Sequence, residues 1–277
     1  MLLRGGLRVW AAVLVVVCGL LGGCGEEVEE AGNASDLHAV ASVLEMEGPT
    51  GPLVKAQLII FKVQGGVKSF VEDADEVTMS FDGLESPTGV LEMDSQRVRL
   101  KAPEGGEAIT TTFYQLDSVQ EQRLVYKPGT FYQVTFRVDG VRHNMFVTTP
   151  EAQNEISKAS EEAINKKLEL VSSSNFDAGI IQVDRLVSMD TTFVSYPYDE
   201  PFLTSVQDVI DTLGQLSKET GSLLTVPPEA FRREGTHRVI FVGLSAVVGG
   251  SENISPGLGS FSGMFAGRSA QLDVNVR

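Results

Sequence analysis

The chain has few of the residues on which catalysis and metal binding depend. It contains two cysteines, three histidines and one tryptophan in 277 residues. Cys18 and Trp10 both lie in residues 1–23, which have the composition of an export signal. Once that segment is removed, Cys24 is the one cysteine left, which excludes an intramolecular disulfide. It also excludes a cysteine–histidine zinc site, because such sites need several of these residues at short spacing.

Basic residues are scarce as well. The chain has 22 lysines and arginines against 37 aspartates and glutamates, a formal net charge of −15 at pH 7. Removal of residues 1–23 takes away Arg4 and Arg8 and no acid, which brings the charge to about −17. Such a surface repels nucleic acid and anionic lipid headgroups. We therefore expect no nucleic-acid partner, and any membrane attachment has to come from a lipid rather than from a basic patch.

Residues 1–23 predict a bacterial export signal that ends at a lipid attachment site. Arg4 and Arg8 precede an apolar core, Val9–Leu21, which is too short to span a bilayer. Leu21-Gly22-Gly23-Cys24 resembles the lipobox of bacterial lipoproteins, in which signal peptidase II cuts between Gly23 and Cys24. The resemblance implies that Cys24 becomes the first residue of the mature chain and carries the lipid, with palmitate among its acyl chains. An ordinary secretory signal and an uncut apolar anchor are the alternatives.

The same resemblance implies a compartment. Gly25, and not an aspartate, follows Cys24, which under the enterobacterial sorting rule implies export to the outer membrane. We therefore expect a lipid-anchored protein of the bacterial cell envelope, held firmly because such lipoproteins carry three acyl chains. Residues 24–51 contain four glutamates near their start and are predicted to be an acidic tether between the lipid and the folded part.

Residues 52–149 predict an antiparallel β-sandwich. Short runs rich in Val, Ile, Phe, Tyr and Thr alternate with turn residues about every ten positions. Asp139-Gly140 is a strong signal for a two-residue hairpin. The expected strands are 55–63, 77–81, 90–94, 97–102, 111–116, 123–126, 131–138 and 141–148. Thr149-Pro150 then predicts the start of a connecting helix, within a linker at 150–170.

Residues 171–277 predict a second β-rich domain. Its expected strands are 178–187, 191–196, 222–226, 238–248 and 263–276. One helix is expected between them, because Ser205 and Asp208 form a capping-box pair and Gly214 stands where a helix would end.

The two halves share a sequence unit. GTFYQVTF begins at Gly129 and GTHRVIF at Gly235, and with a one-residue gap Tyr132 aligns with His237. The unit resembles the last two strands of an immunoglobulin-like sandwich, with Tyr132 as a tyrosine-corner residue. Residues 224–239 are also similar to a stretch in Ig-like repeats of uncharacterised bacterial envelope proteins. The predicted fold class is therefore mainly β: two separable antiparallel Ig-like β-sandwich domains after a cleaved signal peptide and an acidic tether, with one or two short helices.

Nothing in the sequence forms a catalytic or metal-binding signature. No Gly-x-Ser-x-Gly element occurs, and the three histidines are His38 in the predicted tether and His143 and His237 on predicted strands, where packing is the favoured role. The acidic stretch 72–76 lacks the spaced ligands and glycine of a calcium loop and is interpreted as an exposed turn. We expect no enzyme, no catalytic residue, no metal and no cofactor.

A glycine-rich stretch between the last two predicted strands is the candidate contact loop. Its glycine spacing misses the dinucleotide-binding pattern by one position, and no helix follows it. Loops at sandwich ends often carry binding function. The candidate residues are Ser255, Gly257, Gly259, Phe261 and Phe265.

The function expected is presentation of β-sandwich domains to an envelope protein partner, without chemistry. The alternative is a ligand- or glycan-binding accessory lipoprotein, for which Tyr196 and Tyr198 form a candidate aromatic platform. A hydrolase is the third hypothesis.

Overall fold

Strands dominate the part of the chain that the structure describes. The computed structural model describes residues 37–48, 51–64, 67–100, 109–151, 155–158, 164–172, 178–188, 190–194, 223–248 and 262–277. Within these ranges the regular structure is β-strand, apart from one short 3-10 helix, η2 (Pro228–Phe231), which starts at a proline. The prediction of a mainly β protein with antiparallel sheets is confirmed.

The first half of the chain folds as a sandwich of two packed sheets. One contains four consecutive neighbours in the order β1-β2-β7-β6, and the other has the order β5-β4-β8-β9. The strands are β1 (Leu37–Gly48), β2 (Gly51–Gln64), β4 (Asp75–Phe81), β5 (Leu91–Glu92), β6 (Asp94–Leu100), β7 (Ile109–Asp117), β8 (Phe131–Val138) and β9 (Val141–Thr148), while the short β3 (Val67–Phe70) pairs with β2. In chain order this is the A-B-E-D and C′-C-F-G arrangement of immunoglobulin domains.

The core of this sandwich lies between the two sheets. Ala39, Leu58 and Ile60 from one sheet meet Met79 and Val134 from the other. All five side chains are fully buried. Asp139 and Gly140 join β8 to β9 with positive φ values of 52° and 78°. This is the backbone that a two-residue type I′ hairpin requires, so the hairpin prediction is confirmed.

Two expectations about the first half are wrong. The predicted tether extends to residue 51, but Leu37–Gly48 is strand β1, whose Ala39, Ala41 and Val43 are fully buried. Small side chains such as alanine give too weak a hydrophobic signal to predict a strand, yet they fit well into a closely packed sheet. The predicted strand at 123–126 is instead a loop, because its backbone bonds to the hydroxyl of Tyr132 and not to a neighbouring strand.

The second half repeats the arrangement. A three-stranded sheet, β10-β11-β14, packs on the strands β13-β12-β15-β16. These strands are β10 (Ile156–Lys158), β11 (Leu168–Ser172), β12 (Ala178–Arg185), β13 (Asp190–Val194), β14 (Leu223–Val226), β15 (Gly235–Val248) and β16 (Gly263–Val276). The core contains Leu170, Val183, Val226, Phe231 and Phe241, all fully buried. The order of the strands in these two sheets corresponds to A-B-E and C′-C-F-G, as in the first half.

The described residues of the predicted connecting helix hold no helix. Ile156–Lys158 forms strand β10, and Ile164 and Asn165 lie in a turn whose amides bond to the carbonyls of Arg277 and Phe231. A helix with so thin an apolar face would bury little, whereas pairing with β11 lets Ile156 pack against the core of the second sandwich. The second helix expected, at 205–214, lies outside the described residues.

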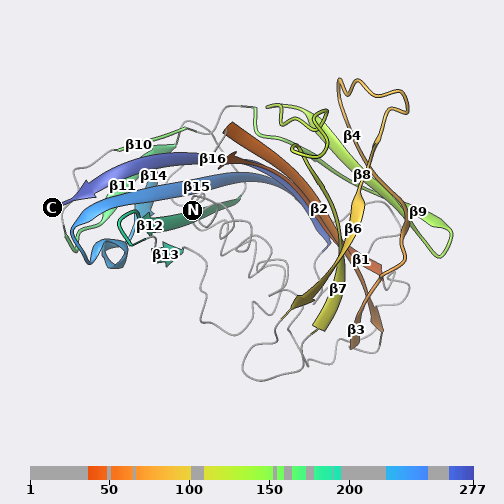
Figure 1. Cartoon of the computed structure of the whole chain (residues 1–277), viewed down its shortest axis with the longest axis horizontal. Coiled ribbons are helices and arrows are strands. Elements are labelled where there is room, and N and C mark those ends of the chain that lie inside the picture. Colours follow the sequence, from red (N-terminus) through yellow and green to blue (C-terminus); the bar gives the residue numbers. More distant parts are fainter. Residues whose placement is uncertain are drawn as a thin grey trace.

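One sheet runs through both sandwiches. Strand β16 pairs in parallel with β1 from Val40↔Gly263 to Glu45↔Arg268, which joins β13-β12-β15-β16 to β1-β2-β7-β6 in a nine-stranded sheet. Figure 1 shows β15 and β16 extending as long curved strands from one half into the other. Met264 and Ala266 of β16 belong to the core of the first sandwich. The two predicted domains are therefore fused along a strand, and the boundary at residue 52 separates β1 from its own sheet.

Strand β16 is closely packed against its neighbours. At Gly267 an added Cβ would stand 2.3 Å from the carbonyl oxygen of Gly243 in β15. The side chains of Arg268 and Glu45 form an ion pair at 2.5 Å, and Glu45 is 9% exposed. Burial raises the pKa of Glu45, and the positive charge of Arg268 partly offsets that effect. We call this region, Val40–Glu45 with Gly263–Arg268, the seam.

Candidate functional site

Most of the predicted site residues lie outside the described part of the chain. This applies to Gly23 and Cys24 at the expected lipid attachment site, and to four candidate contact residues, Ser255, Gly257, Gly259 and Phe261. The fifth, Phe265, is described, and its assignment to an exposed loop is wrong. Phe265 stands in β16 beside Ser42 of β1 and is 7% exposed, because the strand begins at Gly263 and pairs at once.

Tyr132 is a tyrosine corner, as predicted. Its ring is fully buried and stacks on Phe81 at 5.1 Å between ring centroids. Its hydroxyl donates to the carbonyl of Val125 at 2.6 Å and accepts from the backbone N–H of Lys127 at 3.0 Å. Burial raises the pKa of this hydroxyl to about 12. The side chain thus fixes the loop that enters β8.

His237 occupies the corresponding position in the second sandwich. Tyr132 is paired with Val147 and His237 with Val274, in each case near the start of the penultimate strand. The His237 ring is fully buried and meets the Phe231 ring edge-on at 5.5 Å. Its Nδ1 lies 3.0 Å from the carbonyl oxygen of Gly235, to which it donates, because a carbonyl can only accept.

Burial also determines the charge of the histidines on these strands. It lowers the pKa of His237, and the same cause lowers the pKa of His143, so both rings are neutral near pH 7. His143 is 4% exposed and stacks on Phe136 at 5.3 Å. The interpretation of both histidines as packed side chains is confirmed.

Among the described residues, His38 is the histidine whose ring lies next to a serine side chain. It stacks on Phe61 at 5.2 Å, and its Nδ1 lies 3.4 Å from Oγ of Ser262. The same Oγ accepts a hydrogen bond from the N–H of Ala39 at 3.3 Å. Both side chains are at most 5% exposed, so this contact ties β1 to the start of β16 where no solvent-borne substrate can reach it.

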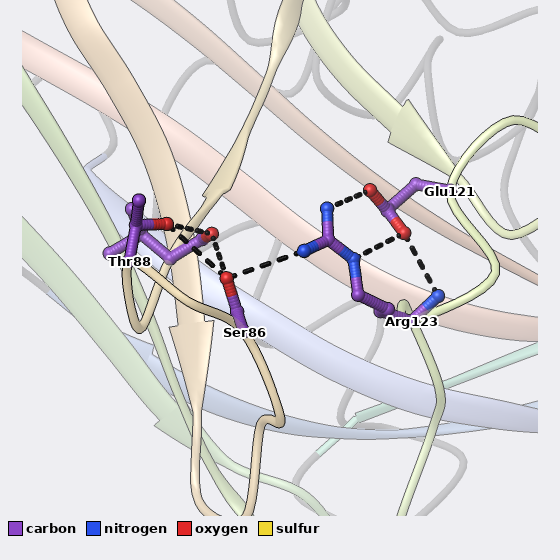
Figure 2. A network of polar contacts seen from close by, with 5 residues as sticks. Ser86, Thr88, Glu121 and Arg123 are labelled. Atoms are coloured by element: carbon purple, nitrogen blue, oxygen red, sulfur yellow. Dashed lines mark hydrogen bonds and ion pairs between the residues drawn. The ribbon is translucent and has the colours of Figure 1, made fainter.

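A polar network joins two loops at one end of the first sandwich. Figure 2 shows Arg123 held by both carboxylate oxygens of Glu121, at 2.8 and 2.5 Å, and reaching Ser86 Oγ at 3.4 Å. Ser86 and Thr88 in turn both donate to the carbonyl of Val90. The hydrogen bonds and charge of Arg123 lower the pKa of Glu121 to about 2. Because Glu121 and Arg123 satisfy each other, the network fixes loop geometry and leaves no charge free for a ligand.

A small cavity of about 320 Å³ opens beside the β8–β9 turn. Its polar lining includes Lys62, Ser69, Asp73, Asp75 and Asp139. The Lys62 ammonium lies 2.5 Å from the Asp139 carboxylate, so the one cation in the lining of this cavity is already paired.

The carboxylates of the acidic stretch 72–76 are exposed, as expected, but the stretch is not all a turn, because Asp75 and Glu76 already belong to β4. Glu72 pairs with Arg97 at 2.9 Å and Glu76 with Arg137 at 3.1 Å. Across the residues that the structure describes, no three histidine, cysteine or acidic side chains are placed to hold a metal ion.

The outer face of β8 and β9 is the most distinctive exposed surface of the described residues. Phe131 and Phe146 are 36% and 42% exposed and stack on each other at 5.8 Å. Beside them, Gln133 Nε2 donates to the side-chain oxygen of Asn144 at 3.0 Å. Further along the same face Arg137 stands directly opposite Arg142. We call this surface the β8–β9 face.

The geometry of the aromatic pair bears on the glycan hypothesis. A sugar ring stacks on an aromatic ring whose face is open to solvent. In the β8–β9 face the planes of Phe131 and Phe146 are within 25° of parallel and turned toward each other. Such a pair presents mainly ring edges, which suit contact with apolar side chains. The other proposed platform, Tyr196 and Tyr198, lies outside the described residues.

Fold and surface together define a class: a mainly β protein whose described residues form two Ig-type sandwiches joined by a shared sheet, with an exposed aromatic and cationic face. No protein-family model matches the chain, and no curated protein matches it at a significant level. A search of the described ranges for a helix long and apolar enough to cross a membrane finds none.

Proposed function

We propose that this protein is a lipid-anchored component of the bacterial outer membrane that presents two fused β-sandwiches to another envelope protein and catalyses no reaction. The observation that carries the proposal is the seam. Because β16 pairs with β1 over six residue pairs, the sandwiches are not free to turn about a linker. Rigid presentation lowers the entropy cost of forming a protein contact.

The side chains that chemistry would need support the same proposal. His38, His143 and His237 are all at most 5% exposed. A general base has to reach the proton that it removes, which a ring packed against phenylalanine cannot do without a rearrangement of the core. The exposed β8–β9 face, by contrast, has the composition of a protein contact: aromatic rings beside an arginine.

The lipid anchor rests on the sequence Leu21-Gly22-Gly23-Cys24. Cys24→Ser tests it, because no other thiol remains after cleavage. We expect the variant to lose its acyl mass and to move to the soluble fraction after high-salt and carbonate washes. A variant that still sediments with membranes, together with a wild type that has no acyl mass, overturns the anchor.

Contact with a partner is tested by site-specific photo-cross-linking in intact cells. A photo-reactive residue replaces Thr148 on the β8–β9 face or, as a control, Val187, which is 77% exposed on the β12–β13 turn. We expect the first position to give a discrete cross-linked species that depends on Cys24, and the second to give none. If neither position gives a cross-link at native expression, the proposed function is wrong.

A further inference from the structure

Two different anchors stand at opposite ends of the β8–β9 face, which Figure 1 places at the outer side of the molecule. At one end the rings of Phe131 and Phe146 stack, and each residue is more than a third exposed. At the other end Arg142 stands directly opposite Arg137. Phe146 and Arg142 are four positions apart on the same face of β9, so about 13 Å of strand separates the two anchors.

The arginine pair has one carboxylate too few. Arginines that stand directly opposite each other destabilise a sheet, because their charges repel. Glu76 pairs with Arg137 at 3.1 Å. Arg142 is exposed and forms no ion pair with the residues that the structure describes. A carboxylate brought by a partner would relieve this repulsion, although the protein as a whole is acidic.

A partner cannot reach the backbone of this sheet at β9. Strands β15 and β16 lie within 8 Å of β9 and cover the side on which a further strand would have to pair. In the middle of the face, Gln133 Nε2 and Thr135 Oγ1 both donate to the side-chain oxygen of Asn144, at 3.0 and 2.9 Å. A bound segment therefore has to satisfy its own backbone hydrogen bonds, as an α-helix does.

We propose that the β8–β9 face binds an amphipathic helix of a partner protein, which lays an apolar side chain on Phe131 and Phe146 and a carboxylate against Arg142. The proposal rests on the proposed function and names the chemistry of the partner. The helix lies along β9, because the two anchors are separated in that direction. It is held by its side chains and pairs with no strand.

The separation of the anchors determines the spacing in the helix. Residues seven or eight positions apart lie on one face of a helix, about 11 Å or about 12 Å apart. The long, flexible side chain of Arg142 spans the small difference that remains. The middle of the face requires no charge, since its amide and hydroxyl groups bond to one another. The matching helix therefore carries an apolar residue and an Asp or Glu seven or eight positions apart, with uncharged residues between them on that face.

The test uses the whole chain, purified in detergent micelles, and a displayed library of helical peptides about five turns long with one random face. Empty micelles first remove the peptides that bind detergent. We expect the enriched peptides to carry the apolar and acidic pair at this spacing. Their dissociation constants should rise at least tenfold with Arg142→Glu and with Phe146→Ser. Thermal melts confirm that every variant is folded.

Two substitutions in the second sandwich are matched controls. Arg233→Glu reverses the charge of an exposed arginine before β15, and Val171→Ser removes an apolar side chain that is 37% exposed on β11. Both should leave the dissociation constants unchanged. Changing the peptide acid to lysine should weaken binding to the wild type and restore binding to Arg142→Glu, which a general loss of structure cannot do.

A proline at the centre of an enriched peptide separates a helix from an extended segment. Because proline breaks a helix, it should lower the affinity at least tenfold. Unchanged affinity of the proline peptide, equal binding to the wild type and to the Arg142→Glu/Phe146→Ser double variant, or an absence of enriched peptides would each overturn the helix site.

The photo-cross-linking experiment at Thr148 distinguishes the two proposals. A cross-linked species that forms in the wild type and is lost in the double variant supports both. A species that forms equally in both backgrounds would leave the proposed function standing and refute the helix site. No cross-link in either background would refute both.

Discussion

Tyr132→Phe tests how the first sandwich fixes its entry loop. The substitution removes a hydroxyl that makes two hydrogen bonds, to the carbonyl of Val125 and from the N–H of Lys127. The ring stays, and with it the stacking on Phe81. A buried hydrogen bond contributes about 0.5–1.5 kcal/mol, and stranded partners add to the loss. We expect the free energy of unfolding to fall by about 2 kcal/mol, measured by urea denaturation of the mature chain.

The same variant has a signature in alkali. The pKa of Tyr132 is raised to about 12 in the folded state, above its unfolded value of about 10. Its contribution to stability is therefore complete below pH 10 and is lost as the pH rises toward 12. Tyr132→Phe should lose less stability than the wild type over this interval. A change in unfolding free energy below 0.5 kcal/mol at pH 7, or an unchanged alkaline profile, would refute the role given to the hydroxyl.

Three other predictions concern the second sandwich and the seam. His237→Phe should cost at most about 1 kcal/mol in urea, because it loses the bond to Gly235 but removes a buried nitrogen, Nε2, that has no partner. It should also reduce the loss of stability as the pH falls below about 6.5, since the unfolded histidine binds a proton before the folded one. Gly267→Ala should cost at least about 2 kcal/mol, since the backbone carbonyl of Gly243 in β15, 2.3 Å from the new Cβ, cannot rotate away; a melting temperature equal to wild type would contradict the close packing of β16 on β15. In a fragment of residues 168–277, hydrogen exchange should show protection at Val239 and Val274 and weaker protection than in the whole chain at 263–268, which keep β15 but lack β1.

The local sequence predicts strands well where the alternation of apolar and polar residues agrees with a turn signal. The alternation of residues 131–138 and 141–148 around Asp139-Gly140 gives β8, β9 and their turn with the observed bounds. Strand β16 is likewise predicted over Gly263–Val276. The prediction fails at β1, where Ala39 and Ala41 carry little hydrophobic signal and glutamates stand nearby. It fails also at 123–126, whose apolar residues pack while their backbone is satisfied by Tyr132.

The candidate site shows a sharper limit. Repeated GTFYQVTF and GTHRVIF were enough to pair Tyr132 with His237 and to predict that both pack inward. The exposed pair Phe131 and Phe146 lies within strands that the sequence predicts correctly, but no pattern in the sequence marks these two rings as a contact surface. Nothing in the local sequence shows that Arg142 faces Arg137 or that β9 ends its sheet, because register and strand order depend on contacts between separate strands.

The sequence by itself determined the β class and the repeated sandwich unit, and it predicts the export and lipidation signal, because strand alternation, turn residues and signal patterns are all local. Only the tertiary structure decided that the two sandwiches are one body. That outcome depends on Val40–Glu45 meeting Gly263–Arg268 across more than 220 positions. Backbone hydrogen bonds between strands are nearly independent of residue type, so no local pattern announces which strands will share them.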